Sequence, residues 1–322
     1  QLDAVVLNSG GANACTGPDG LADTRAMAEA TASALGTTPD QVAVCSTGLI
    51  GVRLPMDAVH AGIAAAAAGL AVDGASDAAL AIMTTDTVPK QAATTSEAGW
   101  SVGGMAKGAG MLAPALATML VVVTTDADLT PAQADTALRA ATRVTFDRTD
   151  SDGCMSTNDT VILMASGASG VAPDLEAFTD ALTQVCGSLA RQLLGDAEGS
   201  SHDIAVTVVN AATEDDAVDV ARCVTRSNLF KTAIFGNDPN WGRVLASAGT
   251  SRATFDPDRV SVSFNGVKVF DTGALGEDRS LVDLTDREVL VEIDLAAGPA
   301  SATVWTNDLT YDYVRENAEY SS

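Results

Sequence analysis

Apolar and polar positions along the chain form blocks that predict a mixed α/β protein. Short β-branched or alternating runs predict strands, because Val, Ile and Thr lose side-chain freedom in a helix. Longer runs with apolar residues every three or four positions predict helices. The expected strands are Leu2–Leu7, Val42–Cys45, Met119–Val123, Val161–Ala165, Ile204–Val209, Val260–Phe264, Glu288–Leu295 and Ala302–Thr306. The expected helices are Ala22–Leu35, Asp57–Leu70, Asp77–Met83, Pro131–Val144, Pro173–Leu194 and Glu214–Ser227.

These elements are unevenly distributed. Helices and short strands alternate over residues 1–225, whereas residues 226–322 consist mainly of alternating strand patterns. Alternation of helices with strands is typical of an α/β core. We therefore expect an α/β core over 1–225 and a smaller, strand-rich C-terminal subdomain over 226–322.

The stretch Lys107–Asp126, KGAGMLAPALATMLVVVTTD, joins a loop of small residues to a buried strand. Glycines in this loop let a substrate or another segment of backbone approach closely. Thr118 lies immediately before the apolar run that begins at Met119. A hydroxyl at the mouth of a buried strand suits a nucleophile, but Thr is also a common strand residue. From these residues alone, both interpretations of Thr118 stay open.

Composition changes the picture by excluding classes of partner. The 322 residues carry a formal net charge of −24, with a pI near 4.1. Nucleic-acid-binding proteins need a basic surface, so this acidity argues against such a partner. No apolar run reaches the roughly 18 residues of a membrane span, so no membrane partner is expected. Only four of the 18 basic residues are Lys, which draws attention to each of them: Lys90, Lys107, Lys231 and Lys268.

Cysteine and histidine usage excludes several kinds of catalytic site. The five cysteines form no CxxC pair, so the chain lacks the pattern of a zinc site or a disulfide framework. Unpaired, scattered cysteines are typical of a reducing cytoplasm. The two histidines, His60 and His202, have no nearby carboxylate or Cys pattern, and we expect both to be structural or exposed. A Ser-His-Asp or Cys-His site is therefore not expected.

One glycine motif resembles a nucleotide-binding fingerprint. GAGMLA, Gly108–Ala113, formally satisfies the GxGxxG/A pattern of dinucleotide-binding folds. That pattern requires a preceding strand and a following helix. Here Pro114 and a Val-rich strand follow instead, so the context argues against a dinucleotide site. No Walker A sequence is present, because the Gly-Lys order is reversed at Lys107-Gly108.

Three polar loops and one helix end are further candidates. The loop Ser46–Gly48 either presents consecutive backbone N–H groups to an oxyanion or forms an ordinary tight turn. The clusters MTTD, Met83–Asp86, and STND, Ser156–Asp159, are explained by turn and capping chemistry. Glu198 lies at the end of the longest predicted helix, where a carboxylate opposes the helix dipole. Such a placement is weak evidence for a binding role.

Seven motifs together carry a family resemblance. In chain order they are NSGGANACTG, CSTGLIG, AIMTTDTVPK, GGMAKGAGMLAPALATML, STNDT, DAEG and KTAIFGNDPNWGRV. They closely resemble glutamate N-acetyltransferase, also called ornithine acetyltransferase, of cyclic arginine biosynthesis, in its actinobacterial form. The match runs from Leu7 to Ser322, nearly the whole chain. The resemblance implies layered sheets with helices, similar to N-terminal-nucleophile enzymes.

The resemblance also implies self-processing. The chain would cut its own Ala117–Thr118 bond and give an α chain, 1–117, and a β chain, 118–322. Thr118 would then be N-terminal. Its α-amino group, with an ordinary pKa of about 7.7–8.0, would serve as the base for its own hydroxyl. Such a site needs no catalytic His.

The resemblance assigns a role to each matching position. Thr118 would be the nucleophile that takes the acetyl group from N2-acetylornithine and passes it to L-glutamate by a ping-pong route. Thr47 and Gly48 would form the oxyanion hole. Substrate-contacting positions would be Thr84, Lys107, Thr118, Glu198, Asn317 and Ser322. The C-terminal tail would thus return to the active site of a catalytic core. No metal or cofactor is implied, although acetyl-CoA is compatible as a second acetyl donor.

Two departures from the family pattern affect these expectations. Family members extend well upstream of the position of Gln1, so we expect an N-terminally truncated copy. After Glu198-Gly199 the family usually has a small residue and then Lys, whereas this chain has Ser200, Ser201 and His202. This change either alters the pocket near Glu198 or follows the general scarcity of Lys.

The expected assembly is cytoplasmic, with substrates that are small molecules and with α and β chains paired as α2β2. Two other functions stay open. One is an N-terminal-nucleophile aminopeptidase or amidase of the same superfamily, in which water accepts the acyl group. The other is a non-catalytic amino-acid-binding relative.

Overall fold

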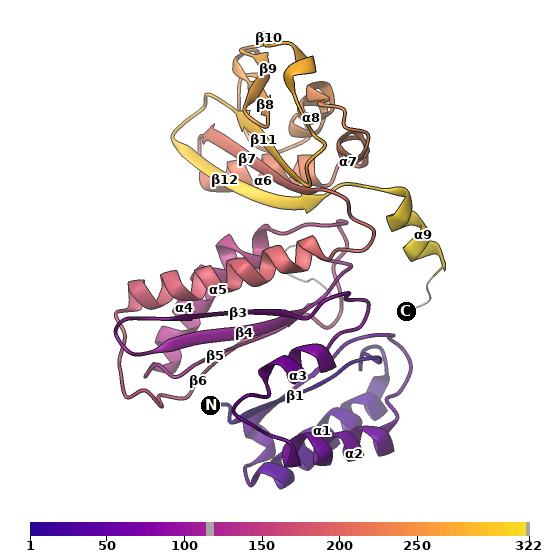
Figure 1. The fold of residues 1–322 in the computed structure, drawn as a ribbon, viewed down its shortest axis with the longest axis vertical. Coiled ribbons are helices and arrows are strands. Elements are labelled where there is room, and N and C mark those ends of the chain that lie inside the picture. The colour runs from indigo at the N-terminus through magenta and orange to yellow at the C-terminus, as the bar shows by residue number, and fades with distance from the viewer. Residues whose placement is uncertain (114–118, 320–322) are drawn as a thin grey trace.

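The computed structural model describes residues 1–113 and 119–319. Within these residues the chain forms a mixed α/β fold whose strands make three separate sheets. The sheets lie one above another along the long axis of the molecule, and helices cover each of them (Figure 1). The expected fold class is confirmed. Thr118 and Ser322, two of the predicted site residues, and the Ala117–Thr118 bond lie outside the described residues.

The N-terminal unit is a pair of parallel strands packed against helices. Ala4 of the first strand lies opposite Val42 of the second. The first helix begins at Gly17, earlier than expected, because side chains of the preceding loop bond to its first turns: Asn13 Nδ2 donates to Gly20 O at 2.7 Å. The unit comprises β1 (Ala4–Asn8), β2 (Val42–Ser46), α1 (Gly17–Leu35), α2 (Met56–Ala68) and α3 (Ala75–Ala81).

The middle unit is a four-stranded sheet in the order β3-β4-β5-β6. The central pair, β4 and β5, is antiparallel, and β6 runs parallel to β5. Helices α4 and α5 cover the face that is turned toward the C-terminal unit (Figure 1). The elements are β3 (Lys90–Thr95), β4 (Ser101–Lys107), β5 (Leu120–Thr125), β6 (Thr160–Ala165), α4 (Pro131–Val144) and α5 (Leu175–Gly195).

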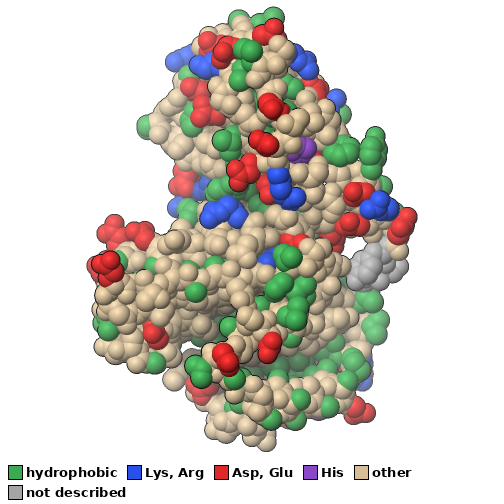
Figure 2. All heavy atoms as spheres, viewed as in Figure 1, with side chains coloured by type: hydrophobic (Ala, Val, Ile, Leu, Met, Phe, Trp, Pro, Cys, Tyr) green, Lys and Arg blue, Asp and Glu red, His purple; other side chains and the backbone are tan. Residues whose placement is uncertain are grey.

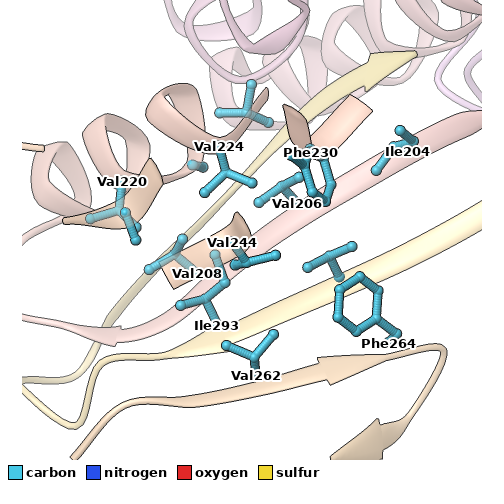
Figure 3. Close-up of a cluster of buried hydrophobic side chains, with 14 of the residues drawn as sticks. Ile204, Val206, Val208, Val220, Val224, Phe230, Val244, Val262, Phe264 and Ile293 are labelled. Carbon is cyan, nitrogen blue, oxygen red and sulfur yellow. The ribbon is translucent and has the colours of Figure 1, made fainter. Parts of the chain in front are cut away.

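The C-terminal unit is a six-stranded sheet in the order β10-β9-β8-β11-β7-β12. Its strands are β7 (Asp203–Ala211), β8 (Ser261–Phe264), β9 (Val267–Asp271), β10 (Ala274–Leu275), β11 (Glu288–Asp294) and β12 (Ala300–Asn307). Its helices are α6 (Glu214–Thr225), α7 (Asn228–Phe235) and α8 (Trp241–Ala248). Valines of α6 and β7 face one another in the core, together with Phe230 and Phe264 (Figure 3). Aliphatic side chains therefore dominate this core, as the low aromatic content requires.

The six-stranded sheet includes β7, which begins at Asp203, while the expected domain boundary at 225/226 stays a prediction. β7 pairs along its whole length with both β11 and β12, and α6 packs against the same sheet. Local patterning could not reveal this, because β7 joins strands that lie some 80 to 100 residues later in the chain. The pairing, and not the change in strand density, defines the sheet.

Four of the described strands, β3, β4, β9 and β10, and three of the described α-helices were not predicted. β3 and β4 have the sequences KQAATT and SVGGMAK, which lack an alternating apolar pattern. They form because β4 pairs with both β3 and β5, and α5 packs against them. The unpredicted helices α7 and α8 are eight residues each, and α9 (Tyr311–Glu319) has no buried residue. Helices of eight or nine residues span too few turns for a helical period to stand out in the sequence.

Gly108–Ala113, the apparent dinucleotide motif, does not open a helix. These residues leave the antiparallel strand β4 as a loop, and no parallel βαβ unit is built on it. Within the described residues, the motif therefore lacks the strand–turn–helix context that a dinucleotide site requires.

Acidic residues outnumber basic ones in the chain, with 42 Asp and Glu against 18 Lys and Arg. On the face displayed in Figure 2, Lys and Arg side chains lie mostly over the C-terminal unit. Among the described residues, no helix is both long and apolar enough to cross a lipid bilayer.

The N-terminus of α4 provides a test of the local structure. Thr130 caps this helix, with Gln133 N donating to its Oγ1 at 3.3 Å and Gln133 Oε1 accepting from Thr130 N at 2.9 Å. We expect Thr130→Ala to lower the free energy of unfolding by about 1 kcal/mol, because the backbone N–H of Gln133 loses its side-chain acceptor. Thermal unfolding measures this. The control is Thr136→Ala on the exposed face of the same helix, and an equal effect of both changes would contradict the capping role.

Candidate active site

One cavity brings together every described residue that the sequence assigned to the site. Its volume is about 400 Å³. Thr47, Gly48, Thr84, Lys107, Glu198 and Asn317 all contribute to its wall, together with Ser9, Gly10, Leu49, Met83, Thr85, Ala109, Gly110 and Met111. These residues come from six separate stretches of the chain, which belong to the N-terminal unit, the middle unit with the loop after α5, and helix α9. Their convergence is a property of the tertiary structure alone.

The loop after β2 packs backbone to backbone against the loop after β1. Gly48 has a φ of +127°, and a Cβ at this position would lie 2.5 Å from Gly10 C. Only Gly fits such an approach. Thr47 N donates to Asn8 O at 3.1 Å, so this N–H is already used. The two candidate donors of an oxyanion hole are therefore the Gly48 N–H and the Thr47 hydroxyl.

Lys107 ends β4 with its side chain buried. Its Nζ donates to Thr47 Oγ1 at 3.0 Å. The Thr47 hydroxyl accepts this bond and can donate its own proton to another group. Burial lowers the pKa of Lys107, while the carboxylates of Asp86, Asp159 and Glu198 act to raise it. The lysine therefore connects the candidate oxyanion loop to the charged groups of the cavity.

Thr84 lies in a turn that Asp86 closes. Thr84 N donates to Asp86 Oδ2 at 3.1 Å, which is the turn chemistry expected for MTTD. Asp86 is itself buried, and its other oxygen accepts from Gly108 N at 2.6 Å. The Asp86 side chain therefore closes the turn and does not line the cavity, whereas Thr84 and Thr85 do line it.

Glu198 reaches the cavity from the loop that follows α5. Its backbone N donates to Ala109 O at 2.8 Å, which joins this loop to the one after β4. A Cβ at Gly110 would lie 2.7 Å from Glu198 Oε2. Gly110 therefore leaves the space that the carboxylate occupies, a role that the sequence pattern alone did not reveal.

Helix α9 brings the C-terminal end of the chain back to the cavity. A Cβ at Gly199 would lie 2.2 Å from Tyr313 N, so α9 approaches the loop of Glu198 at a glycine. Asn317 lines the cavity, and its Nδ2 donates to Tyr313 O at 3.0 Å. Figure 1 shows α9 beside the gap between the units, apart from the C-terminal sheet.

Comparison with known proteins identifies the family. A model of the ArgJ family matches residues 1–322. The chain is 64% identical over 322 residues to the arginine biosynthesis bifunctional protein ArgJ of Streptomyces coelicolor, covering 100% of this chain and 84% of that protein. The chain belongs to the ArgJ family. The protein of the same name from Thermobifida fusca is 61% identical with the same coverage. A crystal structure of ArgJ from Bacillus halodurans is 34% identical, with a TM-score of 0.57, and covers 61% of this chain and 97% of that one.

Membership in the ArgJ family makes the chain an enzyme of arginine biosynthesis and confirms the family resemblance of its motifs. Among the described residues, no group of His, Cys, Asp and Glu is arranged to hold a metal ion. The polar side chains that line the cavity carry hydroxyl, ammonium, carboxylate and amide groups.

The unusual His202 of this ArgJ chain faces away from the cavity. Its Nδ1 contacts Asp308 Oδ2 at 2.8 Å, and its Nε2 contacts Leu284 O at 3.0 Å. Ser201 Oγ also bonds to Asp308 Oδ2. The stretch that departs from the family pattern thus holds β7 to the segment after β12. His202 is structural, and His60 is exposed on α2, as expected for both.

Asp159, from the STND cluster, is a residue that pattern reasoning underrated. It precedes β6, and its Oδ1 accepts from Met119 N at 3.0 Å. Its Oδ2 is buried, and among the described residues no donor contacts it. Burial raises the pKa of this carboxyl from its usual 3.8 to about 7. Met119 directly follows the predicted nucleophile in the sequence, so Asp159 is hydrogen-bonded to the residue next to that nucleophile.

The raised pKa of Asp159 should make the stability of this ArgJ chain depend on pH. The folded protein holds this proton more tightly than the unfolded chain, so stability falls as the pH rises from about 4 through about 7. Asp159→Asn cannot ionise. We expect the melting temperature of Asp159→Asn relative to wild type to be higher at pH 8 than at pH 5.

Thermal unfolding at several pH values measures this difference. Asp135→Asn, on the exposed surface of α4, is the matched control. A difference between Asp159→Asn and wild type that stays constant with pH would contradict the assignment.

Proposed function

We propose that this ArgJ chain transfers the acetyl group of N2-acetylornithine to L-glutamate through an acetyl-Thr118 intermediate. The observation that carries the proposal is the cavity that gathers Thr47, Gly48, Thr84, Lys107, Glu198 and Asn317 from five stretches of the chain. These are the positions that the family resemblance assigns to oxyanion stabilisation and substrate contact. Thr118 and Ser322 complete the proposed set from outside the described residues.

The charges of the cavity suit an α-amino acid. Among its described lining residues, Lys107 is the one cation and Glu198 the one carboxylate. A substrate with an α-carboxylate and an amino group can bond to both at once. N-acetylornithine and glutamate each carry an α-carboxylate, so Lys107 is proposed to hold that group in both half-reactions. Glu198 is proposed to receive the side-chain amino group of ornithine.

The proposed chemistry needs only groups of the chain. After cleavage of the Ala117–Thr118 bond, the α-amino group of Thr118 takes the proton from its own hydroxyl as Oγ1 attacks the acetyl carbonyl. The C–N bond to ornithine then breaks, and the amino group returns the proton to the leaving amine. Attack of the glutamate amine on acetyl-Thr118 reverses these steps and gives N-acetylglutamate.

The oxyanion of each tetrahedral intermediate is assigned to the Thr47 hydroxyl and the Gly48 N–H. The position of Lys107 supports this assignment. Thr47 Oγ1 accepts a hydrogen bond from Lys107, so the Thr47 hydroxyl can donate its proton to the oxyanion. A neighbouring ammonium group also strengthens the hydroxyl as a donor.

The proposal includes an assembly and a location. The α and β chains stay together after cleavage, two αβ units associate as α2β2, and the enzyme works in the cytoplasm. Acetyl-CoA is proposed as a second donor to Thr118 without any bound cofactor. Release of free CoA from acetyl-CoA in the presence of glutamate tests that step.

The proposed self-processing can be tested directly. Purified protein should separate on a denaturing gel into two fragments, the second with the N-terminal sequence TMLVVV. Thr118→Ala should remain a single chain, because it has no hydroxyl to attack the preceding carbonyl. Recovery of only the full-length wild-type chain would contradict the proposed mechanism and favour a non-catalytic binding protein.

The kinetics of ornithine release give a second test. With N-acetylornithine alone, ornithine should appear in a burst of about one equivalent per site and then stop, because the acetyl-enzyme waits for an amine. Addition of glutamate should restore turnover. Steady release of ornithine without glutamate would instead identify an amidase, in which water accepts the acetyl group.

A further inference from the structure

A complete ion cluster lies buried beside the cavity and consists of Asp86, Lys90 and Asp196. The Lys90 side chain, at the start of β3, is fully buried. Its Nζ donates to Asp86 Oδ1 and Asp196 Oδ2, each at 2.6 Å, and to Val88 O at 3.3 Å. An ammonium group has three N–H donors, and these three acceptors satisfy them. None of the three cluster residues lines the cavity.

Asp86 joins the cluster to two loops of the cavity. Its Oδ1 accepts from the backbone N of Gly108, the residue after Lys107, at 2.6 Å. Its Oδ2 accepts from Thr84 N at 3.1 Å. Burial acts to raise the pKa of Asp86, but the hydrogen bonds from Gly108, Lys90 and Thr84 outweigh it and hold the pKa below its usual value. One carboxylate thus fixes the backbone beside both Thr84 and Lys107.

Asp196 joins the same cluster to the loop of Glu198. It ends α5, two residues before Glu198, and its Oδ2 also accepts from Thr87 N at 2.9 Å. The positive charge of Lys90 lies at the C-terminal end of α5, where a cation is favourable to the helix dipole. Lys90 therefore stabilises the end of the helix from which Glu198 enters the cavity.

We propose that the Asp86–Lys90–Asp196 cluster is a positioning element that sets the distance between Lys107 and Glu198 and so selects an α-amino acid of suitable length. This inference rests on the proposed function, which assigns these two residues to substrate binding. Lys107 and Glu198 carry opposite charges and attract one another across the cavity. Because Gly108 is bonded to Asp86 and Asp196 to Lys90, each loop has an anchor of its own that resists this attraction.

A purely structural role would make a different prediction. Buried ion pairs add little net stability, because the loss of hydration offsets their attraction, whereas removal of one partner leaves an unpaired charge and destabilises the fold. A structural cluster would therefore change the melting temperature but not the substrate affinity of the folded protein. A positioning cluster must change the affinity itself.

The main test is Asp196→Asn in the full chain. Asn keeps the size of the side chain and an acceptor for Thr87 but loses the charge that holds Lys90. We expect the Kd for ornithine, measured by calorimetry, and the KM for N-acetylornithine to rise about 10- to 100-fold, with a smaller change in kcat, because misplacement of one binding group by about 1 Å has effects of this size. Lys90→Met, which leaves two buried carboxylates facing each other, should have a larger effect.

Arg148→Met is the matched control. Arg148 is a buried cation that pairs with Glu214 Oε1 at 2.5 Å, and neither residue lines the cavity. This variant should lose thermal stability and keep the wild-type Kd for ornithine. If Asp196→Asn also lowers only the melting temperature and leaves Kd and KM unchanged, the positioning role is overturned.

The pH dependence of ornithine binding provides a second measurement, which a change in packing alone would not alter. Burial lowers the pKa of Lys107, and the charges that face this lysine belong to Asp86, Lys90, Asp159 and Glu198. Asp86 acts to raise the pKa, so Asp86→Asn should lower it further. Only protonated Lys107 attracts a carboxylate. The loss of ornithine affinity at alkaline pH should therefore begin at lower pH in Asp86→Asn and be unshifted in Arg148→Met.

The binding experiments separate this inference from the proposed function. A wild-type chain that binds ornithine but transfers no acetyl group would contradict the proposed function, and the Kd values of the variants would still decide the role of the cluster. If the protein transfers acetyl normally, an unshifted pH profile in Asp86→Asn and an unchanged Kd in Asp196→Asn would contradict the positioning role of the cluster. The proposed function would then still stand.

Discussion

The burial of two ammonium groups at one end of the β3–β4 strand pair constrains the rest of the site. Lys90 begins β3 and Lys107 ends the antiparallel strand β4, so the register brings both to the same edge of the sheet. Neither side chain is appreciably exposed. A buried charge requires a partner and hydrogen bonds. Asp86 and Asp196 meet this requirement for Lys90, and they bring with them the MTTD turn and the end of α5.

Close backbone contacts at glycines complete the convergence of the segments that form the cavity. Gly48 meets Gly10, Gly110 makes room for Glu198, and Gly199 meets the backbone of Tyr313 in α9. A side chain at any of these positions would separate the segments that meet there. The cavity is thus formed by loops whose ends are held by strands and long helices. Such an arrangement keeps polar groups in fixed positions, which the proposed ping-pong route requires for two successive substrates.

Much of the fold could be predicted where local chemistry acts within one element. The helix Pro131–Val144 was expected with the bounds that α4 has, and the Val-rich run was expected to be the strand that became β5. β3 was missed, because KQAATT has no apolar periodicity and becomes a strand only through pairing with β4. The place of β7 in the C-terminal sheet could not be predicted for the same reason, since its partners lie far along the chain. Pairing between distant segments leaves no local pattern.

For the site, the sequence by itself determined the chemical groups and the family, because seven long motifs carry both. Thr47, Lys107 and Glu198 could be named from these motifs, and His60 and His202 could be set aside from their surroundings in the sequence. Only the tertiary structure decided which groups meet, that Lys107 bonds to Thr47, that Gly110 accommodates Glu198, and that Asp159 is left with a buried, unpartnered oxygen. The physical reason is that burial and long-range contact, which set charge state and distance, depend on segments up to a hundred residues apart.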